Sequence, residues 1–460
     1  MESSFIKHPS SYRDPSGFMF VKDGILYRQV NKVFAGDFDL FLNSGLYKKL
    51  IEQKLLIPHE QTDQNLTGSG EWHTTLKPEP VEFISYPYEW SFDMLKDAAL
   101  LTLRLAKESI AFGSILKDAT AYNIQWHKGS LIFIDTLSFE KYNEDEPWVA
   151  YRQFCEQFLG PLLLMHYRKQ PLQQLQLSWP EGIPLQVVSS LLPRRSRLSL
   201  HTYLHVHLNA RLSSKTKTGE KGKTKFSKQK LLNLINSLET LVQKLRLPAQ
   251  KSTWSAYYEE AGNRNDYLDQ KKSIINAWLN DMKNISTAAD LGANDGEFSR
   301  IIAGKDIAVI AADFDPYCIN NLYNSLKSTR ENIQPLIIDL SSPSPAIGIN
   351  NEERSSFLSR VKADLVLALA LIHHLAIGKN LPFDMIAKLF QHCCKRYLII
   401  EFVPKTDEKI QLMLSCKKDI YHFYSEENFR QAFERYFSVT DRKTIGQSGR
   451  VLYLMTKHES

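Results

Sequence analysis

STAADLGANDGEFSR, residues 286–300, decides the fold of the C-terminal half of the chain. A short apolar run predicts a buried strand, a glycine turn follows it, and the next residues predict the start of a helix. Such turns usually bind nucleotides through their phosphate groups. Here two carboxylates, Asp290 and Asp295, accompany Gly292 and Gly296. Acid beside a pyrophosphate is repulsive, so NAD and ATP are disfavoured and a cofactor with a cationic head fits better.

The chain after about residue 270 alternates apolar runs with helical patterns, which predicts an α/β fold with parallel strands buried on both faces. The last two runs suit an antiparallel hairpin at one edge of the sheet. The strands are expected at 285–291, 307–314, 333–339, 363–371 and 396–402, and the hairpin at 436–443 and 450–457.

Two further acids end predicted strands, Asp313 in IAADFDP and Asp339 in IQPLIID. Ligands of open α/β sheets bind at the carboxyl ends of the strands. Asp313 lies where an acid would accept hydrogen bonds from both ribose hydroxyls, and Asp339 could reach an adenine amino group. S-adenosylmethionine, which combines an adenosine with a sulfonium and an α-amino group and has no phosphate, fits this pattern. Asp315 competes for the ribose, but Asp313 is preferred because it lies three residues before Pro316.

This part of the sequence resembles class I methyltransferases that use S-adenosylmethionine. The resemblance rests on the acidic turn, the acids after the next two strands and the run ADLVLALALIHHL (363–375). The resemblance covers about 265–460. It implies a Rossmann-like sheet of seven strands whose last strand is antiparallel. The cofactor-binding residues that we expect are Asp290, Gly292, Asn294, Asp295, Gly296, Asp313, Phe314, Asp339, Leu340 and Ala368.

Catalysis of methyl transfer needs positioning and, for a hydroxyl or ammonium acceptor, a base. His373 and His374 are candidates for that base, although either could instead pack against the cofactor wall, and Glu401 is a further catalytic candidate. The chain lacks an NPPY-type run and a Pro-Cys nucleophile, so O- or N-methylation of a small molecule, sugar or lipid-linked compound is favoured over nucleic acid. No metal site is expected, because the histidines between 201 and 207 lack an evident fourth ligand.

Residues 1–190 predict a separate α+β domain with a signal of its own. In SILKDATAYNIQWHKGSLIFIDTLSF (114–139), Asp118, Asn123 and Asp135 resemble the catalytic loop and metal-binding aspartate of protein-kinase-like folds. The sequence departs from that family, since no Gly-rich loop is evident and Arg28 stands nearest to the position of the nucleotide lysine. A degenerate kinase-like module is therefore expected. A phosphotransferase fused to a cofactor-binding domain and a non-catalytic scaffold are the alternatives.

Residues 191–264 predict a basic helical linker with a flexible Lys-rich loop at about 213–230. The loop is either a solvated connection or a peripheral contact to an anionic surface. Five cysteines without a CxxC pair indicate a reducing compartment, and the longest apolar run is too short to cross a bilayer. We therefore expect a cytoplasmic protein without a transmembrane segment or a specific nucleic-acid partner. The sequence predicts no oligomeric state.

The whole-chain pattern runs from DPSGF (14–18) through SGLY (44–47) and LKDATAYN (116–123) to ALALIHHLAIG (368–378) and LIIEFVPK (398–405). It resembles a bacterial group of methyltransferases known as NoeA-type nodulation proteins. That resemblance implies, at most, modification of a sugar-containing or envelope-related compound.

Overall fold

The computed structural model describes residues 5–144, 146–213, 226–248, 250, 265–415 and 418–459. The chain divides into two compact units. The first comprises Met1–Pro248 with Gly348–Glu353, and the second comprises Ala249–Ile347 with Arg354–Ser460. The division falls after Pro248 rather than near residue 190, because the helices between these points pack onto the first unit. The predicted Lys-rich loop lies largely outside the described residues.

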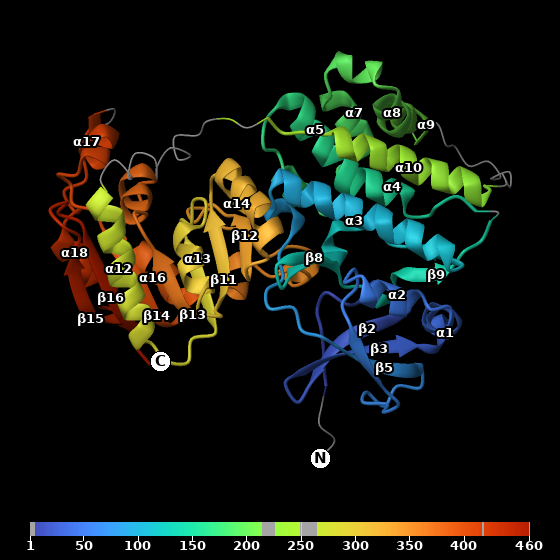
Figure 1. The fold of residues 1–460 in the computed structure, drawn as a ribbon, viewed down its shortest axis with the longest axis horizontal. Coiled ribbons are helices and arrows are strands. Elements are labelled where there is room, and N and C mark those ends of the chain that lie inside the picture. The colour runs from blue at the N-terminus through green and yellow to red at the C-terminus, as the bar shows by residue number, and fades with distance from the viewer. Residues whose placement is uncertain are drawn as a thin grey trace. The chain divides into compact units, whose positions relative to one another are not determined.

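The first unit begins with a five-stranded antiparallel sheet in the order β1-β2-β3-β5-β4. Val30 and Leu76 of the sheet form a buried cluster with Phe34, Phe38 and Leu137. The sheet and its helices, coloured blue in Figure 1, are β1 (Ile6–Lys7), β2 (Gly17–Lys22), β3 (Ile25–Asn31), α1 (Ala35–Asn43), α2 (Leu46–Glu52), β4 (His59–Thr62) and β5 (Trp72–Pro78).

The rest of the first unit is mainly helical, with two short antiparallel sheets of two strands each, in which β6 pairs with β9 and β7 pairs with β8. Its elements are α3 (Phe92–Ala111), β6 (Ser114–Leu116), β7 (Ile124–His127), β8 (Ser130–Phe133), β9 (Phe139–Lys141), α4 (Tyr151–Phe154), η5 (Cys155–Leu159), α5 (Gly160–Arg168), α6 (Leu175–Ser178), α7 (Leu185–Leu191), η6 (Arg194–Leu198), α8 (Leu200–Thr202), η7 (Tyr203–Leu208), α9 (Asn209–Ser213) and α10 (Lys228–Lys244).

Helix α10 explains why the predicted linker belongs to the first unit. Ser227 caps its N-terminus by accepting a hydrogen bond from the Lys230 amide. Leu231, Ile235 and Leu238 recur at helical spacing and are fully buried. This face lies along α3, as Figure 1 shows. Burial of several large apolar side chains holds the helix in place, so it is a packed element rather than a connection.

The second unit contains the predicted seven-stranded sheet, in the order β12-β11-β10-β13-β14-β16-β15. The strands from β12 to β14 are parallel to one another, and β16 is antiparallel to both of its neighbours. The strands are β10 (Thr287–Leu291), β11 (Ala308–Asp313), β12 (Ile333–Ile337), β13 (Ala363–Ala368), β14 (Cys394–Phe402), β15 (Phe437–Thr444) and β16 (Val451–Lys457).

The direction of the chain reverses beside β10, since β11 and β12 follow on one side and β13 and β14 on the other. Right-handed crossovers then place the helices of the two halves on opposite faces of the sheet. This is the switch point at which α/β sheets bind ligands. The helices, coloured yellow to red in Figure 1, are α12 (Asn265–Asp281), α13 (Glu297–Ala303), α14 (Pro316–Thr329), α15 (Phe357–Arg360), η9 (His374–Gly378), α16 (Phe383–Cys393), α17 (Glu408–Ser415) and α18 (Glu426–Phe433).

Candidate functional site

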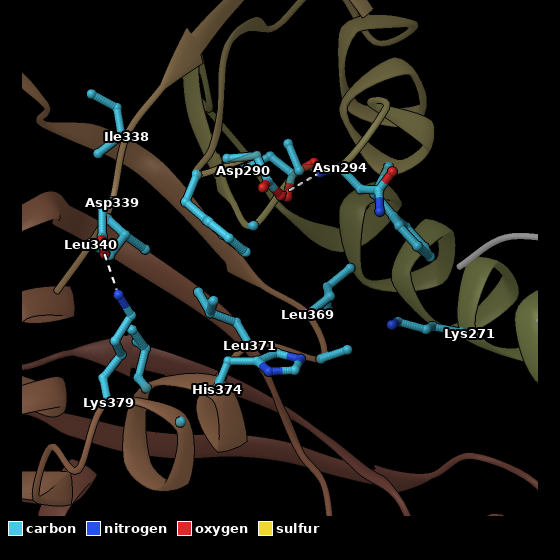
Figure 2. A pocket seen from close by; sticks show the side chains of 18 of the residues that line it. Lys271, Asp290, Asn294, Ile338, Asp339, Leu340, Leu369, Leu371, His374 and Lys379 are labelled. Atoms are coloured by element: carbon cyan, nitrogen blue, oxygen red, sulfur yellow. Dashed lines mark hydrogen bonds and ion pairs between the residues drawn. The ribbon is translucent and has the colours of Figure 1, made fainter. Parts of the chain in front are cut away.

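A cavity of about 240 Å³ opens at the switch point of the second unit, above the carboxyl ends of β10, β11 and β13. Figure 2 shows its two ends, with Lys271 on one side and Asp339 with Lys379 on the other, and His374 between them. Its lining comprises Tyr267, Leu268, Lys271, Asp290, Gly292, Ala293, Asn294, Phe298, Asp313, Phe314, Ile338, Asp339, Leu340, Leu369, Ala370, Leu371, His374, Leu375, Gly378 and Lys379.

The glycine turn forms one wall of the cavity because three of its residues adopt positive φ angles. Gly292 (φ 88°), Asn294 (φ 53°) and Gly296 (φ 86°) turn the chain sharply from β10 into α13. A Cβ at Gly296 would lie 2.6 Å from a Leu322 methyl carbon, so this position needs glycine for space as well as for conformation. The Gly292 amide donates to the Ala312 carbonyl oxygen at 2.8 Å, which ties the turn to β11.

Asp290 and Asp295 have different environments, and only Asp290 lines the cavity. Asp290 ends β10, is 2% exposed and accepts a hydrogen bond from the Ser299 hydroxyl at 2.7 Å. Burial raises the pKa of Asp290 to about 6, against the lowering effect of Ser299. Asp295 is exposed, at the outer side of the turn. The acid that can meet a ligand is therefore Asp290, which sequence reasoning left undecided.

Asp313 and Asp315, the two competing acids after β11, also separate clearly. Asp315 caps α14 by accepting hydrogen bonds from the Tyr317 and Cys318 amides. Asp313 lines the cavity, and its two oxygens accept from the Asn294 and Asp315 amides, each at 2.9 Å. Burial raises the pKa of Asp313 to about 6, although these amides lower it. Two backbone donors therefore fix its orientation and leave lone pairs for a ligand.

The far end of the cavity is formed by Phe314, Asp339 and Leu340, as the sequence predicted for a ligand wall. Asp339 accepts from the Ser341 amide at 2.9 Å and forms an ion pair with Lys379 at 3.0 Å. Burial would raise the pKa of Asp339, but Ser341 and Lys379 hold it below its usual value. The predicted residue Ala368 is fully buried at the end of β13 and lies outside the lining, which the next three residues form instead.

The two predicted histidines occupy different positions, and only His374 lines the cavity. Burial and the nearby charge of Arg450 lower the pKa of His374 to about 4, so its imidazole is neutral near pH 7. His373 is 2% exposed, and its Nδ1 atom has no hydrogen-bond partner among the residues that the structure describes. Its pKa lies well below the usual range because it is buried. His373 therefore contributes to the packed wall behind the cavity, and His374 is the better candidate for a base.

Glu401, the third predicted catalytic residue, does not line the cavity. It is fully buried at the end of β14, where Lys271 Nζ and the Tyr267 hydroxyl donate to its two oxygens, each at 2.5 Å. The Ala370 amide also donates to it at 2.9 Å. Burial would raise the pKa of Glu401, but the charges of Lys271 and Arg450 lower it. With both oxygens occupied, Glu401 is placed to hold the cavity wall and not to exchange protons with a substrate.

Lys271 and Tyr267 line the cavity, and sequence reasoning missed both. They lie on α12, about one turn apart, some twenty residues before the glycine turn. The Lys271 side chain is 2% exposed, and Nζ lies 5.1 Å from the centre of the Phe298 ring. A lysine on the apolar side of the helix, four residues before the buried Ile275, was the available signal.

The three kinase-like residues lie close together in the first unit. Asn123 Nδ2 is 3.4 Å from an oxygen of Asp135, whose other oxygen forms a 2.5 Å ion pair with Arg28. Burial opposes the charged form of Asp135, but Arg28 outweighs it and the pKa lies below its usual value. The pKa of Asp118 is raised by burial and by the charge of Asp135. Arg28 therefore neutralises the carboxylate that the kinase resemblance assigns to metal binding.

Neither a metal cluster nor a membrane span is found in the part of the chain that the structure describes. No three His, Cys, Asp or Glu side chains within it are placed to hold a metal ion. Nor is any helix there long and apolar enough to cross a bilayer. His201 and His205 both contact the Ser237 hydroxyl, and His207 contacts the hydroxyls of two serines, each within 2.9 Å. These contacts account for the histidine cluster in the sequence.

Comparison with known proteins gives one relative that matches the whole chain. The nodulation protein NoeA of Rhizobium meliloti (strain 1021) is 34% identical over 468 residues, which cover 98% of this chain and 96% of the relative. No family model matches the chain.

Similar solved structures cover less than half of the chain. The magnesium protoporphyrin IX methyltransferase of Synechocystis PCC 6803 with bound SAH is 15% identical, covers 46% of this chain and 90% of its own, and has a TM-score of 0.32. The N-methyltransferase NodS of Bradyrhizobium japonicum WM9 is 13% identical, covers 42% of this chain and 98% of its own, and has a TM-score of 0.33. The bifunctional kinase-methyltransferase WbdD is 17% identical, covers 43% of this chain and 39% of its own, and has a TM-score of 0.29. At these TM-scores the likenesses establish no shared activity.

Proposed function

The chain belongs to the family of the nodulation protein NoeA, and from this premise we propose that its second unit is an S-adenosylmethionine-dependent methyltransferase. The observation that carries the proposal is the polar wall of the cavity, which contains three strand-end carboxylates: Asp290, Asp313 and Asp339. A pyrophosphate would be repelled there, whereas a nucleoside with hydroxyl donors and a cationic tail would be attracted.

The adenosine half of the cofactor fits the end of the cavity formed by Asp313, Phe314 and Asp339. Asp313 is held by two backbone amides and is the acceptor for the ribose hydroxyls. Phe314 is half exposed beside it and offers an aromatic face to the adenine. Asp339 is the acceptor for the adenine amino group, and Lys379 must share that carboxylate.

The methionine half fits the end formed by Asp290 and Lys271. Asp290 is a buried acid with no cationic partner at hydrogen-bonding distance among the described residues, so a ligand ammonium or sulfonium would stabilise its charged form. Lys271 Nζ is held by Glu401 and faces the same cavity, and it could meet a carboxylate. The donor set therefore suits a zwitterionic, cationic ligand.

When bound, S-adenosylmethionine supplies a methyl group on a sulfonium, which an acceptor atom displaces in line. His374 stands in the cavity wall as a neutral imidazole and can take a proton from a hydroxyl or ammonium acceptor. Leu369, Leu371 and Leu375 surround it and exclude water from the reacting centre. We propose O- or N-methylation of a small-molecule, sugar or lipid-linked acceptor. The sequence contains neither the NPPY-type run nor the Pro-Cys nucleophile described above, which supports this acceptor class over nucleic acid.

Binding of S-adenosylmethionine tests the proposal directly. Calorimetry and thermal melting should show binding to the wild type, loss of binding in Asp313→Ala, and unchanged binding in Asp295→Ala. The last variant is the matched control, because it removes an exposed acid from the same turn. Mass spectrometry of cell extracts incubated with the protein and a labelled methyl donor would then identify the acceptor. A wild type that binds no cofactor at millimolar concentration would overturn the proposal.

A second candidate function concerns the first unit, where Asp118, Asn123 and Asp135 lie together. This cluster supports a kinase-like module that binds a nucleotide. The Arg28–Asp135 ion pair argues against phosphoryl transfer, because it places a cation where magnesium would bind. Titration with magnesium-ATP distinguishes the possibilities. Binding that Asp135→Ala abolishes supports a nucleotide site, and a flat titration leaves the module as a scaffold.

A further inference from the structure

The solvent-facing side of the segment 198–212 in the first unit carries leucines where a surface helix normally carries polar groups. Leu198, Leu200, Leu204 and Leu212 are 89%, 67%, 42% and 58% exposed. We call these four residues the leucine face. Five of the six exposed leucines in the described ranges lie between residues 191 and 212, counting Leu191 at 40%. Single exposed leucines are ordinary, whereas a cluster marks an interaction site.

Helical geometry places Leu200, Leu204 and Leu212 on one side of the segment, and Leu198 precedes them at the end of η6. Leu200 and Leu204 are four residues apart across α8 and η7, and Leu212 follows in α9. The opposite side, including Thr202, Val206 and Ala210, is buried against the first unit. The segment is already anchored through that side, and α8 lies next to α10, where Figure 1 shows both. The leucine face is therefore not needed to hold the fold.

The charges within the segment that carries the leucine face have one sign, and Glu239 on the neighbouring α10 is paired with Lys107. Residues 182–219 contain no aspartate or glutamate. Within the described part of that stretch, Arg194, Arg195 and Arg197 immediately precede or adjoin Leu198 and are exposed. None of the three forms an ion pair with a carboxylate of the described residues, and Arg195 donates instead to the Tyr167 carbonyl oxygen at 2.9 Å. A partner that covers this surface must offer negative charge beside an apolar layer.

We propose that the leucine face and its arginines form a site for peripheral binding to an anionic lipid bilayer. Leucines enter the boundary between headgroups and acyl chains, while arginines pair with lipid phosphates. A single-stranded nucleic acid fits less well, because its bases stack on aromatic side chains, and the exposed apolar groups here are aliphatic. A second copy of the chain also fits less well, because a two-fold interface would bring the same arginines together. This inference does not depend on the proposed methyl transfer.

Co-sedimentation of the full-length protein with vesicles tests the proposal. The wild type should bind vesicles of equal phosphatidylglycerol and phosphatidylcholine and should not bind phosphatidylcholine alone. Arg194→Gln with Arg197→Gln should weaken binding about 30-fold, since each basic residue near an anionic surface contributes about fivefold. The double variant Leu198→Ser with Leu200→Ser should weaken vesicle binding about tenfold. It should also remove the fraction of vesicle binding that persists at high salt.

Two exposed residues elsewhere supply matched controls. Leu412→Ser removes a 67% exposed leucine of the second unit, and Arg152→Gln removes an exposed arginine that is paired with Glu156. Both should bind the mixed vesicles like the wild type, and all variants should keep the wild-type melting temperature. The proposal is overturned if the wild type ignores anionic vesicles or if the leucine variant binds them equally well. It is also overturned if the leucine variant converts a dimer to a monomer, or if RNA binds with leucine-independent affinity and displaces the vesicles.

Discussion

Asp290 should make the affinity for S-adenosylmethionine depend on pH in a range where the cofactor itself does not titrate. Its carboxyl group is buried, accepts a hydrogen bond from the Ser299 hydroxyl at 2.7 Å, and has a pKa that burial raises to about 6. A cationic ligand needs the ionised form. Binding should therefore weaken as the pH falls through about 6, whereas the cofactor's amino group titrates near about 8. Below pH 6, binding should be accompanied by release of a proton.

The expected size follows from the pKa. The ionised fraction of Asp290 falls from about nine-tenths to about one-tenth between about pH 7 and about pH 5, so the dissociation constant should rise about tenfold. Asp313, whose pKa is also about 6, can add up to the same factor. In the ligand-free protein, raising the pH ionises Asp290 and lowers the stability of the fold, whereas it strengthens cofactor binding. Because burial raises the pKa from 3.8 to about 6, the folded state binds more protons than the unfolded state in that interval. Its stability therefore falls as the pH rises, by up to about 3 kcal/mol.

Isothermal titration calorimetry in buffers of different ionisation enthalpy would measure both the affinity and the released proton. Asp290→Asn should remove the about tenfold contribution of that residue to the pH dependence, weaken binding at neutral pH, and raise the melting temperature of the ligand-free protein. Asp295→Asn should change none of the three, because that residue lies outside the cavity. A dissociation constant that stays constant from about pH 5 to about pH 7 in the wild type would refute the reasoning.

Three further predictions concern the frame of the site. Lys271→Met leaves Glu401 buried without its closest cation, so it should lower the free energy of unfolding by about 3–5 kcal/mol in urea denaturation. Adding Glu401→Gln should restore part of the lost stability, because it removes the unpaired charge. Gly296→Ala should lower the free energy of unfolding by about 1–3 kcal/mol, because φ is 86° and the new methyl group would meet Leu322. Gly304→Ala, at a φ of −62°, should leave the free energy of unfolding nearly unchanged in the same assay. His374→Asn should reduce transfer of labelled methyl to extract acceptors about 100-fold and leave cofactor affinity within about twofold. Equal transfer by this variant would remove His374 as the base.

The sequence predicted the parts of this structure that depend on local pattern. Alternating apolar runs predicted the strands of the second unit, and the paired glycines predicted the turn after β10. The choice between Asp290 and Asp295 could not be made in advance, because it depends on which side of the turn each carboxylate faces. The position of Glu401 outside the cavity lining could not be predicted for a related reason. A strand-end acid has the same sequence context whether it faces a cavity or a buried cation.

Long-range packing was the main source of error. Lys271 meets Glu401 across 130 positions in sequence, and no local pattern couples the two. The amphipathic face of α10 predicted a helix but not the surface of α3 that it covers. In both cases the sequence specified which side chains must be buried, and only the fold specified their partners.

The balance of buried charge explains why the cavity should select a cation. Lys271 in the cavity wall and Arg450 behind it offset Glu401 and Asp407, and Arg450 donates to both oxygens of Asp407 at 2.8 and 3.1 Å. These four charges cancel, so they impose no net sign on a ligand. Asp290 forms no ion pair within the described residues, and burial raises its pKa although the charge of Lys271 lowers it. An acid kept partly neutral at the carboxyl end of a central strand destabilises the empty protein and gains its charge when a cation arrives. The site therefore obtains affinity from an interaction that folding alone does not satisfy, which is the expected signature of a binding site and not of a structural acid.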